Sequence, residues 1–173
     1  MTSLRPVLAA AALCLAPLAA HAADACFSAC LKPRMAAPDV DDQTIREALS
    51  ACRARCEEAT RARLVAAGGG SALACAPSPL SPGEFRKVRS ASPSVVGLAG
   101  AFLWEVDNVL PDKVIRRVEI STQNMSLQEV AMTAAGIAPP GERATFLVPH
   151  VGDGYPAVRL SSRVVAIYAC PAR

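Results

Sequence analysis

The sequence CFSAC at residues 26–30 and the sequence CRARC at residues 52–56 have the same cysteine spacing, so the chain carries two Cys-x-x-x-Cys pairs. A spacing of four residues places the two cysteines of a pair one turn apart on the same face of a helix. Bonds within a pair are disfavoured, because such side chains seldom reach disulfide geometry. If two such helices run antiparallel, the outer cysteines meet and the inner cysteines meet. The spacing therefore predicts a hairpin with disulfides Cys26–Cys56 and Cys30–Cys52.

The twin pairs resemble the helical hairpins of the alpha-hairpinins and of the small mitochondrial import chaperones, which are stapled first to fourth and second to third. The resemblance covers about residues 24–66 and implies the covalent architecture only. The gap between the pairs, residues 31–51, is longer than expected for those families. Four thiolates gathered around zinc or copper remain an alternative at this stage.

Residues 1–22 have the layout of a secretory signal peptide. Arg5 precedes the apolar run VLAAAALCLA at residues 7–16, and Ala20-His21-Ala22 forms a small-x-small cleavage site. The apolar run is too short for a membrane span, which needs about 20 apolar residues. The sequence before Cys26 does not fit a lipobox. We expect cleavage after Ala22, with cleavage after Ala23 as the alternative, and no membrane span after cleavage. The Ala-rich and Arg-rich composition is typical of high-GC bacterial coding, so we expect a periplasmic destination.

The cysteine count bears on the compartment, and the charge balance bears on the kind of partner. Cys14 lies in the leader, and its removal leaves six of the seven cysteines, an even number that suits an oxidising compartment. With the hairpin assigned, Cys75 remains to pair with Cys170. The chain has 18 Lys and Arg against 15 Asp and Glu, and Arg5 leaves with the leader. This near balance gives no field that attracts nucleic acid, so no nucleic-acid partner is expected.

The chain is predicted to divide into four parts: residues 1–22 signal peptide, 23–67 twin-CX3C helical hairpin, 68–83 Gly/Pro-rich linker and 84–173 immunoglobulin-like β-sandwich. In the hairpin, Pro33 is expected to end the first helix at residue 32. Asp41 or Asp42 caps a second helix over about residues 43–67. The run Gly68-Gly69-Gly70 ends that helix.

Beyond residue 84 the apolar period changes to two. Phe102, Trp104 and Val106 alternate with other residues, as a strand with one buried face requires. A second strand is predicted where Val114, Val118 and Ile120 share one face, and two more are predicted at residues 144–148 and 163–170. Residues 126–135 could be helix, because Ser126 and Glu129 form a capping box. A strand is favoured there, since the sandwich otherwise lacks one. The predicted fold class is α+β.

The segments at residues 104–108, 115–120 and 137–146 resemble the strand-Asn-turn-strand and Pro-Gly-Glu signatures of bacterial immunoglobulin-like and fibronectin-III-like accessory domains. The similarity spans about residues 84–170. It implies an antiparallel sandwich that binds, spaces or supports other parts. Such folds host many functions, so the fold alone does not select one.

Catalytic motifs are not found. His150 is the one histidine of the expected mature chain, and although Asp153 is near, no Gly-x-Ser-x-Gly elbow accompanies it. The sequence has no Cys-x-x-Cys redox motif and no phosphate-binding glycine loop. We therefore expect a protein that is not an enzyme and that carries no cofactor or metal.

The sequence favours an exported accessory protein that binds another envelope or periplasmic protein through the rigid hairpin. Aromatic, aliphatic and Arg side chains are frequent at interface hot spots, so the candidate contact residues are Phe27, Leu31, Arg53, Arg55, Arg61 and Arg63. Alternatively, Phe27, Leu31 and Ile45 pack between the helices or against the sandwich. Two other functions stay open: a soluble periplasmic inhibitor or ligand-binding module that uses loop residues 149–156, and metal binding through the twin cysteine pairs.

Overall fold

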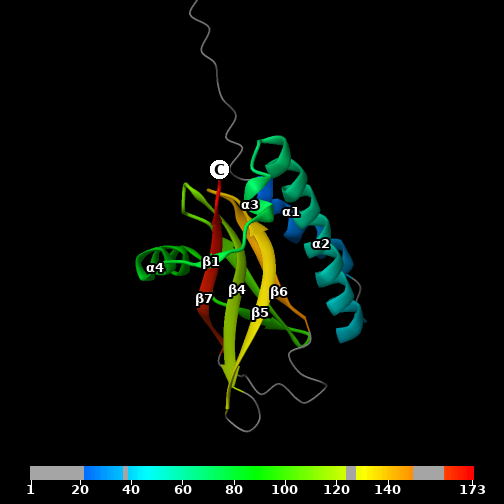
Figure 1. The fold of residues 1–173 in the computed structure, drawn as a ribbon. Coiled ribbons are helices and arrows are strands. Elements are labelled where there is room, and N and C mark those ends of the chain that lie inside the picture. The colour runs from blue at the N-terminus through cyan, green and yellow to red at the C-terminus, as the bar shows by residue number, and fades with distance from the viewer. Residues whose placement is uncertain (1–21, 37–38, 124–127, 150–161) are drawn as a thin grey trace, which may run out of the picture.

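A computed structural model of the chain describes residues 22–36, 39–123, 128–149 and 162–173. Helices lie at the N-terminal side and are followed by antiparallel sheets, which confirms the α+β class (Figure 1). Residues 1–21 of the predicted signal peptide (residues 1–22), together with His150 and Asp153, lie outside the described residues.

The hairpin consists of α1 (Ala22–Arg34) and α2 (Asp42–Ala66). Its two disulfides are those predicted: Cys26–Cys56 with Cα atoms 5.9 Å apart, and Cys30–Cys52 with Cα atoms 5.6 Å apart. The Asp41 side chain caps α2 by accepting a hydrogen bond from the Thr44 backbone N–H at 2.7 Å. Pro33 does not stop α1 at residue 32, because the helix runs on to Arg34 and Pro33 lies within its last turn.

In the described part of the chain, seven strands form two antiparallel sheets: β1 (Ser78–Pro79), β2 (Val96–Leu98), β3 (Ala101–Asp107), β4 (Lys113–Gln123), β5 (Glu129–Ala138), β6 (Arg143–Val148) and β7 (Ser162–Pro171). The larger sheet has the order β1-β7-β4-β5, and the smaller has the order β2-β3-β6. Side chains from both sheets share one core, which includes Trp104, Phe146, Ile115 and Ile167. The two sheets therefore pack face to face as a sandwich.

The strand β5 resolves the ambiguity over residues 126–135 in favour of a strand from Glu129 onward, because eight of its residues pair with β4. The set of β4 residues that face the sandwich core differs from the prediction that Val114, Val118 and Ile120 share one face. A β-bulge between Ile115 and Arg117 shifts the register, so Ile115 joins Val118 in the sandwich core. Val114 instead packs with a separate cluster around Cys170. A bulge adds one residue and reverses the side-chain alternation beyond it.

The segment predicted as a linker is structured. It contains the short helix α3 (Ser71–Ala74) and β1, which pairs with β7, and α4 (Pro82–Ala91) follows. Ala72 is buried beside Cys170, and the disulfide Cys75–Cys170, predicted from the sequence, holds this segment to the last strand with Cα atoms 6.1 Å apart. Tertiary packing therefore overrides the Gly-rich and Pro-rich composition. The signal for α4 is present in the sequence as Ser81-Pro82-Gly83-Glu84, a capping box with proline at the first turn.

The capping residue Glu84 gives the fold a defined acid sensitivity. The Lys113 ammonium, 2.5 Å away, together with Ser81 lowers the pKa of Glu84 from 4.5 to about 2. Because the folded pKa is the lower one, this stabilisation is present above pH 4.5 and is lost as the pH falls through about 2. We expect Glu84→Gln to lower the unfolding free energy at pH 7 by about 0.2–1 kcal/mol, since the pair is partly exposed. Urea unfolding at several pH values measures this. Equal stability of the two proteins at pH 7 would contradict it.

Candidate interaction surface at the hairpin–sheet seam

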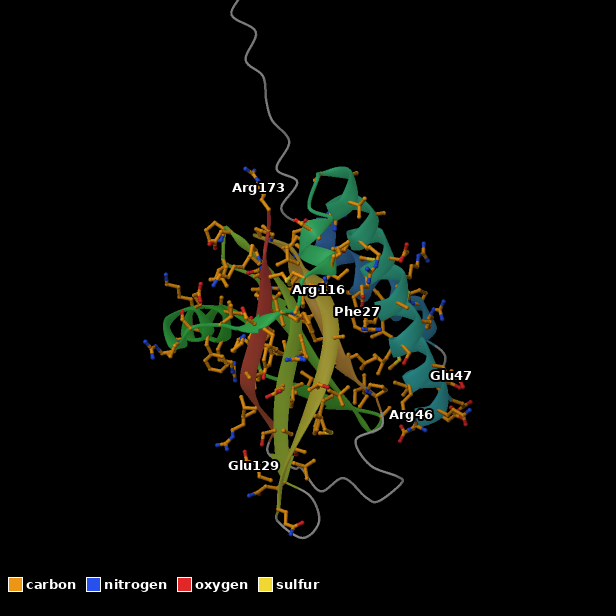
Figure 2. The ribbon with its side chains drawn as sticks, viewed as in Figure 1. Phe27, Arg46, Glu47, Arg116, Glu129 and Arg173 are labelled. Carbon is orange, nitrogen blue, oxygen red and sulfur yellow. A yellow bond between two sulfur atoms is a disulfide. The ribbon has the colours of Figure 1, made fainter. Side chains whose placement is uncertain are left out.

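The hairpin buries its apolar face on the smaller sheet. Phe27, Leu49 and Cys52 from the helices form one cluster with Ala101, Leu103 and Leu147 from β3 and β6. Figure 2 shows Phe27 between the helices and the sheet, where the side chain is 8% exposed. Leu31 and Ile45 pack against the same cluster. Of the two alternatives raised by the sequence, the described structure therefore shows packing of these apolar residues against the sandwich.

The smaller sheet is buried on both faces as a result. Along β3, Phe102 and Trp104 point into the sandwich core, whereas Ala101 and Leu103 meet the hairpin. The period-two pattern predicts one buried face only. The signal for the second face is the uninterrupted apolar run Ala-Phe-Leu-Trp, because a strand covered on both sides reads as a continuous hydrophobic run.

A recess of about 150 Å³ opens where α1 and α2 meet β3, β5 and β6. Apolar groups line part of it, including Phe27, the Cys26–Cys56 disulfide, Ile137 and Ala144. The other lining residues are polar, charged or small: Arg53, Glu57, Ala59, Thr60, Arg63, Glu105, Arg143 and Thr145. The recess is therefore lined by three arginines and two glutamates together with apolar groups.

The arginines of the recess are held in place by the sheet. Arg53 donates to the Ala135 carbonyl at 2.9 Å and pairs with Glu57 at 3.0 Å. Arg63 pairs with Glu142 at 2.9 Å, across the seam from α2 to the turn before β6. Charge-assisted hydrogen bonds of this kind fix the direction of a guanidinium. Arg53, Arg63 and Glu57 are thus held in fixed positions at the recess.

Arg143 is held from the sandwich side. It donates to both carboxylate oxygens of Asp107, at 2.6 and 2.8 Å. This two-pronged contact joins β3 to β6 at their paired residues Asp107 and Arg143. Nothing in the sequence pattern marks Arg143 as part of the surface, because only the pairing of β6 with β3 brings it to the recess.

A second arginine group lies beside the recess. Arg61 pairs with Glu57 at 3.2 Å. Arg116 reaches from the β4 bulge to the carbonyls of Ala72 at 2.7 Å and Gly136 at 3.3 Å, and Figure 2 places it near α3. Burial, with a smaller contribution from Arg61, lowers the pKa of the Arg116 guanidinium, although Glu57 opposes the shift. The bulge that places Arg116 here is not readable from the apolar pattern of β4.

The structure brings together only part of the predicted contact set. Phe27, Arg53 and Arg63 line the recess, and Arg61 lies beside it through its pair with Glu57. Leu31 is packed in the hairpin–sheet cluster away from the recess lining. Arg55 is exposed on α2 and does not line the recess. That these residues contact a partner stays a prediction.

The cysteine sulfurs are not free to bind metal in this structure, because all six described cysteines form disulfides. Three disulfides are typical of an oxidising compartment outside the cytoplasm. Within the described ranges, we find no cluster of three His, Cys, Asp or Glu side chains that could hold a metal ion. The helices in these ranges also include none long and apolar enough to cross a membrane.

The recess combines a rigid apolar patch with fixed guanidinium and carboxylate groups, which suits capture of one apolar side chain flanked by charged neighbours.

Comparison of the chain with models of protein families, with curated proteins and with solved structures gives no significant match to any of the three.

Proposed function

We propose that this protein is an exported, non-enzymatic accessory protein of the bacterial envelope that binds another envelope or periplasmic protein at the hairpin–sheet seam. The observation that supports this is the recess itself, where Phe27 and a disulfide form an apolar patch between positioned arginines. The resemblance of residues 84–170 to immunoglobulin-like accessory domains, and the layout of residues 1–22 as a leader, support the same assignment.

The staples give the surface a further property that suits binding. Two disulfides and a buried contact with the sheet fix the hairpin, so little conformational freedom is lost when a partner docks. Arginines and aromatic groups at a well-packed centre are also the commonest interface hot spots. We therefore place the centre of the interface at the recess, and we place Arg55 outside it.

The size of the recess favours a protein partner over a small ligand. Sites for drug-sized molecules occupy about 300–1,000 Å³. The recess offers about 150 Å³, which is room for a single side chain. A ligand-binding module that encloses its ligand therefore fits this site less well than a protein partner that inserts one anchor residue.

A matched pair of substitutions on α2 tests the proposal. Ala59 is exposed and lines the recess, whereas Ala62 is exposed on the same helix and does not line it. We expect Ala59→Trp to fill the recess and to reduce capture of the partner from a periplasmic extract at least about tenfold, the loss expected when a hot spot is blocked. Ala62→Trp should leave capture unchanged. Quantitative mass spectrometry of proteins bound to immobilised variants provides the measurement.

Two outcomes would refute this site. One is equal recovery of the same protein by Ala59→Trp and the unmodified chain. The other is loss of that protein with both variants, which would place the interface on the open face of α2. Circular dichroism should first show that both variants keep their helix content.

A further inference from the structure

The three disulfides differ in how deeply their cysteines are buried. Cys52 is 0% exposed and Cys170 is 1% exposed, so two of the bonds each have one end inside a hydrophobic cluster. Cys26 and Cys56 are both partly exposed. Among the three disulfides, Cys26–Cys56 is therefore the one with neither cysteine fully buried.

The recess gives this bond open space. Cys26 and Cys56 both line it, whereas the other four bonded cysteines do not. Thiol–disulfide exchange begins when a thiolate attacks one sulfur of a disulfide, so its rate depends on access to that sulfur. A thiolate that enters the recess therefore meets Cys26–Cys56 and no other disulfide.

The recess also holds a hydroxyl that suits the thiolate released by such an attack. Thr60 follows Cys56 by four residues on α2, so it lies one turn away on the same face, and both residues line the recess. Thr60 is buried, and its Oγ1 accepts from Arg63 Nη2 at 3.2 Å. A hydroxyl that accepts one bond keeps its own proton for donation. The part of the chain that the structure describes shows no acceptor for that proton.

The other two bonds release their thiolates in worse places. Attack on the partly exposed Cys30 or Cys75 leaves the electron pair on Cys52 or Cys170, each inside a hydrophobic cluster. Burial of a charged sulfur among apolar groups is unfavourable. Exchange at these two bonds is therefore disfavoured while the cores stay closed.

We propose that Cys26–Cys56 is a thiol-exchange site, at which a cysteine of the docked partner forms a reversible covalent bond with this chain. The inference rests on the proposed function for the place where the partner docks. The partner's thiolate attacks Cys26 Sγ, and a mixed disulfide forms as the Cys26–Cys56 bond breaks. The electron pair leaves on Cys56 Sγ, to which the Thr60 hydroxyl donates. Attack of the Cys56 thiolate on Cys26 Sγ reverses the step and releases the partner's thiolate, so no other oxidant or reductant is consumed.

The nested bond makes this exchange compatible with the fold. Cys30–Cys52 still closes the hairpin when Cys26–Cys56 is open, and Leu49 still packs the hairpin on the smaller sheet. The recess of about 150 Å³ has room for one side chain, and a cysteine is small enough to enter it. The inner bond thus preserves the hairpin, while the outer bond is available for exchange.

The order in which the bonds open tests the site without any partner. The folded, oxidised protein is treated with reduced glutathione, quenched with acid and alkylated, and peptide mass spectrometry identifies the modified cysteines. We expect Cys26–Cys56 to open at least about tenfold faster than the other two bonds, because access and leaving group both favour it. Glutathione should be found on Cys26. Trp104 fluorescence, which reports on the sandwich core, should not change. Another bond that opens as fast, or glutathione found on Cys56 instead, would overturn the proposal.

Substitutions on α2 test the two features that favour the bond. Ala59→Trp fills the recess and should slow the opening of Cys26–Cys56 at least about tenfold, whereas Ala62→Trp should not change it. Thr60→Val removes the hydroxyl and should slow it by roughly threefold to tenfold, and Thr60→Ser, which keeps the hydroxyl, should not. Circular dichroism should first show unchanged helix content. Opening at the original rate in Ala59→Trp contradicts access through the recess, and an original rate in Thr60→Val contradicts the role of the hydroxyl.

Release of a captured partner separates this inference from the proposed function. A partner captured from an anaerobic periplasmic extract by the unmodified chain should stay attached in concentrated urea and be released by dithiothreitol. The double variant Cys26→Ala with Cys56→Ala should release it in urea alone. A partner that leaves the unmodified chain in urea would overturn the exchange, although the docking site stands. Equal capture by Ala59→Trp would overturn the docking site, and the order of bond opening is measured independently of it.

Discussion

Replacing Cys75 and Cys170 together by alanine is expected to lower the melting temperature by roughly 10–20 °C. The bond closes a loop with a sequence separation of 95 residues. On the chain-entropy model such a loop restricts the unfolded chain by about 4.7 kcal/mol, a large part of a domain's net stability. Cys170 is also buried with Val114 and Ile137, so smaller side chains at this position lose packing as well.

Differential scanning calorimetry measures this effect, and the hairpin supplies its control. Cys26→Ala with Cys56→Ala removes one of two nested bonds, while Cys30–Cys52 still closes the hairpin. We expect a much smaller drop for this pair, because the remaining bond already restricts the same loop. Equal drops for the two double variants would show that the long loop contributes no special constraint.

Leu49→Ala is expected to lower the unfolding free energy by about 2–5 kcal/mol, the usual cost of truncating a buried leucine. Leu49 is fully buried on α2 and contacts the cluster that includes Leu103 and Leu147 of the smaller sheet. The substitution leaves a cavity at the centre of the hairpin–sheet contact. Because the disulfides hold the two helices together, the chief contact weakened is the one between hairpin and sheet.

Two optical signals follow the two parts of the chain separately. Trp104 is the single tryptophan and lies in the sandwich core, so its fluorescence reports on the sheets. Circular dichroism at helical wavelengths reports mainly on α1 and α2. In the unmodified protein we expect the two urea transitions to coincide. In Leu49→Ala the midpoints of both transitions should move to lower urea concentrations. Val65→Ala, at an exposed site of the same helix, should change the unfolding free energy from either signal by no more than about 0.5 kcal/mol. Sheets that unfold at an unchanged urea concentration would show that hairpin and sandwich are independent.

The covalent framework could be predicted from cysteine spacing because an i, i+4 pair has only one face on which to meet its counterpart. The third bond followed by elimination. The strands β3, β4, β6 and β7 also followed from local pattern, and so did β5, where the competing capping box at residues 126–129 does not prevent strand pairing with β4. The short strands β1 and β2 were not predicted. In these cases the local signal and the final packing agree.

The packing of the hairpin on the sandwich could not be predicted in the same way. A phenylalanine such as Phe27 is common both at interfaces and in protein cores. Only the packing of the hairpin over Leu103 shows that Phe27 belongs to the core. The recess depends on the same arrangement, since Arg143 and Glu105 reach it from strands remote in sequence. By contrast, α4 was predictable from Ser81 and Glu84, and the proline-rich composition around them obscured it.

The nesting of the hairpin bonds has a consequence for biosynthesis. A chain that emerges N-terminus first presents Cys26 and Cys30 together, well before Cys52 and Cys56. An oxidase that joins cysteines in order of appearance would form the consecutive bond Cys26–Cys30, which α1 cannot accommodate without distortion. The native bonds instead cross from one helix to the other. We therefore expect maturation to require a disulfide isomerase, or oxidation slow enough for both helices to form first, and a strain that lacks isomerase activity should accumulate mispaired protein.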